Sequence, residues 1–483
     1  MRLLGRCQYL KLHSLSPTTS LSSTRSASTL GSTSLPQPRL NYRALCENPT
    51  SKSLNALNRK APLPPDAIQS VVRLYTEFKS LSTTLNVKRN ERSIVGENIK
   101  KSAPEEADAP KRTARRLKEE ISQLESTASQ MQEELLSLAL AIPNDTHPES
   151  PLGPESSAVT LAVRGPSPIP ADPNRDHVKL STKLGLIDLE SGATITGSSW
   201  YYLTNEAALL EFALTNYALS VAINHGFTPV TTPDVVRSDI AKRCGFQPRD
   251  RSSQAFHLQS QSPSSPELIL SGTSEIPLAG MFANRLYPMQ DLPIRVVGVG
   301  RAFRAEAGAR GADTRGIYRV HQFTKVELFA VTDRDSSERM MEDMRGVQQA
   351  ILDGLNIPYR IMDMPTEELG ASAYRKYDMD AWMPGRGSWG EVTSLSNCTD
   401  YQSRRLLIRY QPPVNSSSSS PTLFAHTLNG TAAAIPRLIV ALLESGMQFD
   451  DKGDPVRLRL PAVLRPFWLN PVLSSRSLVE WDS

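Results

Sequence analysis

The sequence predicts an α+β protein in which an antiparallel coiled-coil arm precedes an antiparallel or mixed sheet flanked by helices. Two observations predict this fold. A long heptad seam lies in the N-terminal third, and from about Val178 strand-like runs alternate with amphipathic helices. These runs lack the regular strand–helix repeat of a parallel doubly wound sheet. The 483-residue chain is long enough for more than one domain with a large core.

The first 46 residues differ in composition from the rest of the chain. They contain no Asp or Glu, and their Arg and Lys residues are scattered among many Ser, Thr and Leu residues. A leader of this kind is typical of an organelle transit peptide, so we assign residues 1–46 to a leader for the mitochondrial matrix. A secretory signal fits less well because Arg6 and Lys11 interrupt the short apolar run. A disordered tail without a targeting role is the alternative.

Residues 47–143 predict a helical arm. Apolar residues recur at helical spacing in 68–85, and steps of four and three between 117 and 142 form a heptad seam. We expect two helices that pack as an antiparallel hairpin. Residues suited to the turn lie between them: Gly96, Pro104 and Pro110.

The distal half of this arm is basic, although acidic residues dilute the charge. On composition alone, a helix of mixed charge is more often a solvated face than a surface that binds RNA. The arginines that would contact RNA phosphates are Arg89, Arg92, Arg112, Arg115 and Arg116.

Overall composition excludes several other classes of protein. The net charge of +4 permits contact with nucleic acid without arguing for it. No unbroken apolar run approaches 18 residues, so we expect no membrane span. The four cysteines form no CxxC pair, which argues against a zinc ribbon or a disulfide scaffold. Residues 144–177, rich in Pro, Ser, Glu and Asp, are interpreted as a linker to a globular domain at 178–483.

The segment 303–329 carries the clearest chemistry. Arg304 and Glu306 would share one face of a strand, and after a glycine-rich turn 318–329 alternates like a second strand. The planar fork of Arg304 suits a phosphate. Phe323 could cover a flat ring, and Glu327 could receive an ammonium group. A site suited to both a nucleotide and an amine indicates an enzyme that activates amino acids. The simpler alternative is a solvated charged hairpin.

This segment resembles motif 2 of class II aminoacyl-tRNA synthetases, and its end, RVHQFTKVELF, is similar to the seryl-tRNA synthetase version. Other stretches resemble the same family in the same order. They are motif 1 at 206–233, a Thr-x-Glu loop at 272–275, the ATP and metal region at 377–405, and motif 3 at 426–444. An apolar strand is expected at 268–270, before the Thr-x-Glu loop, and an apolar helix at 432–444, within motif 3. The arm resembles the tRNA-binding arm of this family, including KRNERS at 88–93. Together the resemblance covers roughly 68–467.

The resemblance implies a class II synthetase fold, a homodimer, and ATP-dependent ligation of L-serine to tRNA(Ser). The reaction would pass through seryl-adenylate and release AMP and diphosphate. The alternatives are a class II synthetase for another amino acid and a non-catalytic synthetase paralogue that binds RNA. Loss of a key residue would indicate the paralogue, and Arg304, Glu391 and Arg437 are all present.

The resemblance also implies roles for individual residues. It places Mg²⁺ on Glu391 and Ser394, whose oxygens suit this hard cation. Thr273 has an alternative role as a helix N-cap. The catalytic residues implied are Arg304, Glu391 and Arg437. The serine-binding residues implied are Thr273, Glu275, Glu327, Asn429 and Thr431. The ATP-binding residues implied are Arg304, Glu306, Arg319, Val320, Phe323, Glu391, Ser394 and Arg437.

Overall fold

The computed structural model describes residues 35–101, 108–246, 254–259, 262, 265–306, 315–413, 421–469 and 478–482. Residues 36–483 form one compact unit, and the elements below all belong to it.

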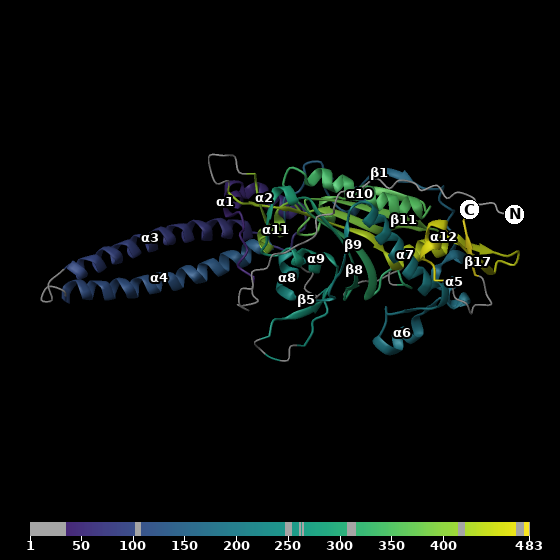
Figure 1. Cartoon of the computed structure of the whole chain (residues 1–483), viewed down its shortest axis with the longest axis horizontal. Helices are drawn as coiled ribbons and strands as arrows, with labels where there is room; N and C mark the ends of the chain where they lie inside the picture. The colour runs from purple at the N-terminus through teal and green to yellow at the C-terminus, as the bar shows by residue number, and fades with distance from the viewer. Residues whose placement is uncertain are drawn as a thin grey trace, which may run out of the picture. The chain divides into compact units, whose positions relative to one another are not determined.

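The arm consists of two long helices that run side by side, α3 (Ala67–Lys101) and α4 (Asp108–Ala141) (Figure 1). Two shorter helices, α1 (Tyr42–Glu47) and α2 (Pro49–Asn58), lie at its base. The early residues of α3 pack with the late residues of α4, which confirms the antiparallel hairpin. Buried seam residues include Ile68, Val71, Leu74 and Leu85 on α3, and Leu117, Ile121, Leu135 and Ala139 on α4.

Both helices extend further towards the tip than the sequence predicts. Gly96 lies within α3 rather than in a turn, so the expectation for this residue was wrong. Pro110 lies in the first turn of α4, also inside the helix. The first turn tolerates proline because its N–H groups have no intrahelical acceptor. Pro104 falls outside the described residues.

The largest sheet has eight strands in the order β1-β10-β11-β12-β15-β9-β8-β4. Strand β4 pairs with β8 in parallel, and the other neighbouring strands pair antiparallel. The predicted antiparallel sheet is therefore confirmed. Its strands are β1 (Val159–Arg164), β10 (Tyr359–Asp363), β11 (Arg375–Met383), β12 (Ser388–Asn397), β15 (His426–Ala434), β9 (Gln322–Thr332), β8 (Ile294–Phe303) and β4 (Thr228–Thr231).

Three boundaries differ from the expectations. Strand β1 lies inside the stretch interpreted as a linker, because it pairs with β10 at one edge of the sheet. Strand β8 ends at Phe303, where its pairing with Gln322 ends, so Arg304 and Glu306 follow the strand and do not lie in it. Residues 432–434 belong to strand β15 because they pair with β9, and not to the helix that follows.

One face of the sheet is covered by α7 (Asn205–Asn224), α10 (Ser337–Gly354) and α12 (Ile435–Gly446). Leu210, Met344 and Leu438 from these helices are fully buried in the main core. By length and composition alone α7 could cross a membrane. Here, however, its residues Leu210 and Leu214 pack against the sheet. The opposite face of the sheet carries polar side chains, among them Glu327, Asn429 and Thr431.

The remaining elements are short. The helices are α5 (His177–Leu184), α6 (Leu189–Thr196), α8 (Ser238–Arg243), α9 (Glu275–Met281) and α11 (Tyr401–Leu406). The small sheets comprise β2 (Ile187–Asp188) with β3 (Tyr202–Leu203), β5 (Val235–Arg237) with β6 (Leu268–Leu270), β14 (Leu423–Phe424) with β13 (Arg409–Gln411) and β7 (Leu286–Pro288), and β16 (Met447–Phe449) with β17 (Pro455–Leu460) and β18 (Val479–Trp481).

Candidate active site

The polar face of the sheet gathers the predicted residues from strands that are far apart in the sequence. On β9, Phe323 and Glu327 are four residues apart and therefore point to the same side. Thr431 on β15 lies opposite Glu327 in the antiparallel ladder, and Asn429 is two residues before it. These side chains consequently project from one surface of the sheet.

A β-bulge brings Glu391 and Ser394 onto this same surface. Residues three apart in a regular strand point to opposite faces. In β12, however, Glu391 lies opposite Asp380 and Ser394 lies opposite Asp378, so Val392 is an extra residue in the ladder. Because Asp378 and Asp380 are two apart, their partners share one face. The hydroxyl of Ser394 lies 3.4 Å from that of Thr431.

Arg304 lies just beyond β8, over the ring of Phe323. Its guanidinium carbon is 5.4 Å from the ring centroid, and its Nε donates to the carbonyl of Gly272 at 3.3 Å. Burial lowers the pKa of Arg304, and the neighbouring Arg437 guanidinium lowers it further. Two cations held close together in a buried site are well suited to a ligand with several negative charges.

Arg437 extends from α12 to Glu391 and to the ring of Tyr318. Its Nη1 donates to the Glu391 carbonyl at 2.9 Å and lies 3.4 Å from the Glu391 carboxylate. Burial acts to raise the pKa of Glu391, but the charges of Arg437, Lys376 and Arg304 together outweigh it and the pKa is lowered. Arg437 and Arg386 approach the Tyr318 ring to 4.8 and 3.8 Å from its centroid. Motif reasoning did not single out Tyr318 or Arg386 for this role.

A second group of contacts surrounds Glu275 at the start of α9. Its Oε1 accepts from Asn429 Nδ2 at 3.0 Å and from Gln402 Nε2 at 2.6 Å. Burial, together with the neighbouring charge of Glu327, raises the pKa of Glu275 to about 7. Thr273 is buried, and its hydroxyl accepts from the Glu275 N–H at 3.3 Å. The predicted N-cap of this helix is wrong in position, because Ser274 is the N-cap.

Lys325 is a further buried residue of this face. Its ammonium group lies 2.6 Å from the Glu327 carboxylate, and both side chains are almost completely buried. The period of two along β9 would have placed Lys325 beside Phe323 and Glu327, so the sequence did contain the signal. Because a lysine in an alternating strand is usually exposed, the sequence analysis did not assign Lys325 to the site.

Glu306 and Arg319 lie near the two ends of the segment that joins β8 to β9. Their charged groups are 3.8 Å apart, and Glu306 has a backbone φ of 44°. Val320, in contrast, buries its side chain in the main core, so its backbone is the part that can reach a ligand. Gly308 and Gly311, which belong to the predicted glycine-rich turn, fall outside the described residues.

A buried polar pair holds the backbone next to Arg386 and Ile317. Glu444 of α12 accepts from His177 Nδ1 at 2.9 Å and from the Gly385 and Arg386 N–H groups at 2.8 and 3.1 Å. His177 Nε2 in turn accepts from the Ile317 N–H at 3.3 Å. No local motif could reveal this pair, because its members are 267 residues apart in the sequence.

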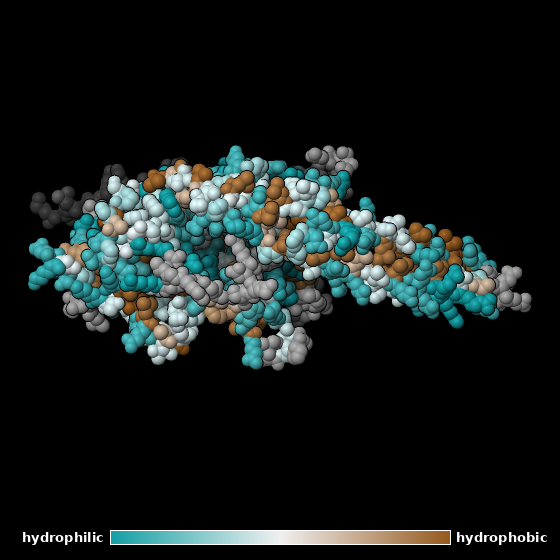
Figure 2. Space-filling model, turned by 180° about the vertical axis from the view of Figure 1, so that it is seen from behind, coloured by the Kyte–Doolittle hydropathy of each residue, from teal (hydrophilic) through white to brown (hydrophobic). Residues whose placement is uncertain are grey.

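The predicted RNA-contacting arginines lie on the arm, separate from the sheet surface. All five are exposed, two on α3 and three on α4: Arg89, Arg92, Arg112, Arg115 and Arg116. Arg89 forms an ion pair across the hairpin with Glu125 at 2.8 Å. Figure 2 shows hydrophilic residues over much of the arm, interrupted by hydrophobic patches.

Two family models match the chain. One, described as the seryl-tRNA synthetase N-terminal domain, matches residues 40–146. The other, described as the tRNA synthetase class II core domain (G, H, P, S and T), matches residues 256–446. Both matched regions lie in the unit that contains the arm and the sheet.

Individual relatives match over most of their own length. The chain is 38% identical over 434 residues to a serine–tRNA ligase of Treponema denticola, covering 89% of this chain and 98% of that protein. It is 41% identical over 438 residues to a mitochondrial serine–tRNA ligase of Schizosaccharomyces pombe, covering 89% and 88%. A crystal structure of seryl-tRNA synthetase from Pyrococcus horikoshii complexed with ATP is similar with a TM-score of 0.79 and 32% identity, covering 89% and 98%.

Proposed function

The chain belongs to the seryl-tRNA synthetase family, and we propose that it ligates L-serine to tRNA(Ser) with consumption of ATP. The single observation that carries this proposal is the shared surface of the sheet. A cationic half around Arg304 and Arg437 adjoins a polar, acidic half around Glu275 and Asn429. The first half suits a triphosphate, and the second suits a small hydroxylated amine.

In the first step, a serine carboxylate oxygen attacks the α-phosphorus of ATP. The bond from that phosphorus to the bridging oxygen breaks, diphosphate leaves, and seryl-adenylate forms. Arg304 would hold the α-phosphate and Arg437 the γ-phosphate. Fixed guanidinium groups stabilise the charge that develops on the phosphoryl oxygens, and positioning supplies most of the remaining acceleration. In the second step, a hydroxyl of the tRNA 3′ end takes the seryl group and AMP leaves.

The adenine would lie against Phe323, with its amino group at Glu306 and with further ATP contacts from Arg319 and the backbone of Val320. Arg304 already covers the Phe323 ring at 5.4 Å. Because the face of the Phe323 ring is open to a flat cationic group, it can also stack against a flat base.

The donor set fits Mg²⁺. The bulge at Val392 turns the Glu391 carboxylate and the Ser394 hydroxyl to one side, and hard oxygen ligands are those that Mg²⁺ prefers. Within the described part of the chain, no group of three or more His, Cys, Asp or Glu residues forms a metal cage. Two protein oxygens together with phosphate oxygens match the usual mode for a nucleotide-bound ion, which would neutralise phosphate charge.

Serine would occupy the pocket formed by Thr273, Glu275, Glu327, Asn429 and Thr431. Asn429 Nδ2 already donates a hydrogen bond to Glu275 Oε1, which orders both side chains. A pocket that hydrogen-bonds the substrate hydroxyl discriminates strongly against alanine, because alanine would leave buried polar groups without partners. The argument favours serine over the substrate of another class II enzyme.

The arm would bind tRNA(Ser) through phosphate contacts and helix shape, with Arg89, Arg92, Arg112, Arg115 and Arg116 as the contacting residues. Their exposure on both helices of the hairpin supports this role. Recognition by shape and backbone is the usual mode for helical RNA.

We also propose a homodimer formed through α7 and the edge strand β4. On α7, Phe212 and Ile223 remain 51% and 44% exposed, although the opposite side of this helix is buried. Strand β4 is at one edge of the eight-stranded sheet. A second copy would cover both the apolar side chains and the edge. Light scattering of the purified chain should give twice the protomer mass, and Phe212→Asp should reduce it.

A location in the mitochondrial matrix is proposed from the acid-free leader and from mitochondrial relatives such as that of Schizosaccharomyces pombe. Helix α1 begins at Tyr42, whose ring stacks on Tyr75 of the arm at 5.4 Å between centroids. We therefore place the end of the leader before α1, rather than at residue 46. A reporter fused to residues 1–40 should enter mitochondria, and a cytosolic signal would contradict the proposal.

Aminoacylation tests the whole function. The purified chain should attach radiolabelled serine to a tRNA(Ser) transcript in the presence of ATP, and Arg437→Ala should remove this activity. Binding of the transcript without charging would instead support the non-catalytic paralogue.

A further inference from the structure

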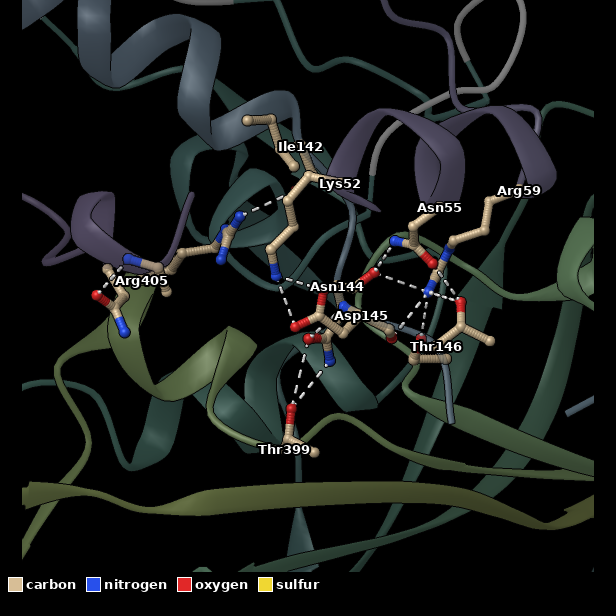
Figure 3. Close-up of polar contacts among 12 residues, drawn as sticks. Lys52, Asn55, Arg59, Ile142, Asn144, Asp145, Thr146, Thr399 and Arg405 are labelled. Carbon is tan, nitrogen blue, oxygen red and sulfur yellow. Dashed lines mark hydrogen bonds and ion pairs between the residues drawn. The ribbon is translucent and has the colours of Figure 1, made fainter. Parts of the chain in front are cut away.

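The base of the arm is joined to the rest of the protein by buried polar contacts (Figure 3). Arg59, which follows α2, is only 3% exposed. Its Nη1 donates to the carbonyls of Asn144 and Ala373 at 3.0 and 2.9 Å, and its Nη2 donates to that of Gly370. A buried guanidinium with several carbonyl acceptors fixes those backbone segments relative to one another.

Asn144, three residues beyond the end of α4, makes the central connection. Its backbone N–H donates to the Ala371 carbonyl at 2.8 Å. Its side-chain Nδ2 donates to the carbonyls of Ser372 and Cys398, each at 2.9 Å. One side chain therefore holds the loop at 370–374 and the end of strand β12 to the base of the arm.

Cys398 lies directly between this joint and the proposed serine pocket. While its carbonyl accepts from Asn144, its Sγ accepts from Asn429 Nδ2 at 3.3 Å. The same Asn429 nitrogen donates to Glu275 at 3.0 Å. Cys398 thus joins the amide of Asn144 to Asn429, and Asn429 in turn contacts Glu275.

A second connection runs through helix α11. Arg405 Nη2 donates to the carbonyls of Leu140 and Ile142 at 3.4 Å, at the end of α4. These carbonyls lie at the C-terminal end of α4, where carbonyl groups have no intrahelical donor. Three residues earlier on α11, Gln402 donates to Glu275 at 2.6 Å. Both connections lead from the base of the arm to the same wall of the pocket.

We propose that Asn144 is a positioning residue for serine: by holding Cys398 from outside, it sets the place of Asn429 and Glu275 inside the pocket. This inference rests on the proposed function, because it assumes that these two residues contact serine. It assigns to the base of the arm a role in amino-acid binding that does not require tRNA. Asn144 itself does not touch the substrate.

The test measures serine-dependent exchange of diphosphate into ATP, without tRNA, on the full chain. Asn144→Ala removes the donor to both carbonyls, and its KM for serine should rise about tenfold, the effect expected for a lost buried hydrogen bond. The KM for ATP should stay within about twofold, because the ATP residues lie outside this network. Arg59→Lys, which keeps the charge but loses the fork geometry, should shift the serine KM in the same direction.

Lys52→Ala is the matched control. Lys52 lies at the same joint and pairs with Asp145 at 2.5 Å, without belonging to the connection through Cys398. Its kinetic constants should equal those of the unmodified chain. In a double-mutant cycle, Cys398→Ala should weaken the effect of Asn144→Ala on the serine KM, since the link to Asn429 is then already lost.

Thermal unfolding of each variant distinguishes a role in positioning the serine pocket from a role in stability alone. An Asn144→Ala protein that melts at a lower temperature but keeps its serine KM would overturn the inference. An equal rise in the KM values for serine and ATP would overturn it too. If the unmodified chain showed no serine-dependent exchange, the proposed function would be overturned as well. Failure of the inference alone is therefore distinguished from failure of the proposed function.

Discussion

Replacing Glu444 by Gln should weaken both the fold and the ATP site. Glu444 is completely buried, and each of its carboxylate oxygens accepts two hydrogen bonds. Oε1 accepts from the His177 N–H and Nδ1 at 3.2 and 2.9 Å, while Oε2 accepts from the Gly385 and Arg386 N–H groups at 2.8 and 3.1 Å. In Gln, one of these oxygens becomes an NH₂ group, which accepts none.

Whichever way the amide turns, two of the four donors lose their acceptor. A buried donor left without a partner costs about 1–3 kcal/mol, so the free energy of unfolding should fall by roughly 3 kcal/mol. The ATP site should loosen as well, because Arg386 carries the guanidinium that covers Tyr318 at 3.8 Å. The KM for ATP should rise while the KM for serine changes little.

Urea denaturation and diphosphate exchange measure these two effects. Glu133→Gln, at an exposed position on α4, is the matched control and should change stability by less than about 0.5 kcal/mol. If Glu444→Gln were as stable as this control, the four hydrogen bonds would not contribute to the free energy of unfolding as predicted. An unaltered KM for ATP in a destabilised variant would refute the link from Glu444 to the nucleotide.

Three further predictions concern the two substrates and the arm. Arg304→Ala should slow activation about a hundredfold or more in diphosphate exchange, with incomplete recovery in Arg304→Lys; a near-normal rate would remove Arg304 from the site. The pKa of Glu275 is raised to about 7, and its ionised form adds the negative charge that, beside Glu327, attracts the ammonium group of serine, so the KM for serine should rise about tenfold for each pH unit below 7. Glu275→Gln should abolish this pH dependence, and a flat profile in the unmodified chain would contradict it. Charge reversal at Arg112, Arg115 and Arg116 should raise the KM for tRNA, more at low salt than at high salt, with the serine KM nearly unchanged; equal tRNA kinetics would show that these arginines do not contact RNA.

The parts of the fold that could be predicted are those whose signal is local. The seam from Leu117 to Ile142 repeats along one helix and the residue after it, and four of its positions, Leu117, Ile121, Leu135 and Ile142, are buried. The strand Leu268–Leu270 also has the expected bounds, because a short apolar run between loops has few alternatives. Gly96 misled the prediction because a single glycine costs a helix only about 1 kcal/mol, which packing along a long hairpin offsets.

Features of the site that depend on pairing between distant segments could not be predicted. The bulge at Val392 is defined by its register against β11, which the sequence of β12 does not contain. The contact between His177 and Glu444 and that between Asn144 and Cys398 likewise join segments far apart in the chain. Resemblance to the family motifs predicted the residues that would contact ligands. The residues that hold those side chains in place could be identified only from the structure.

The most direct test of the central claim is amino-acid-dependent exchange of diphosphate into ATP by the purified chain. The account predicts exchange with serine and a response to alanine at least about a hundredfold weaker, because alanine leaves the polar groups of the pocket without partners. Exchange supported better by another amino acid, or no exchange with serine, would contradict it.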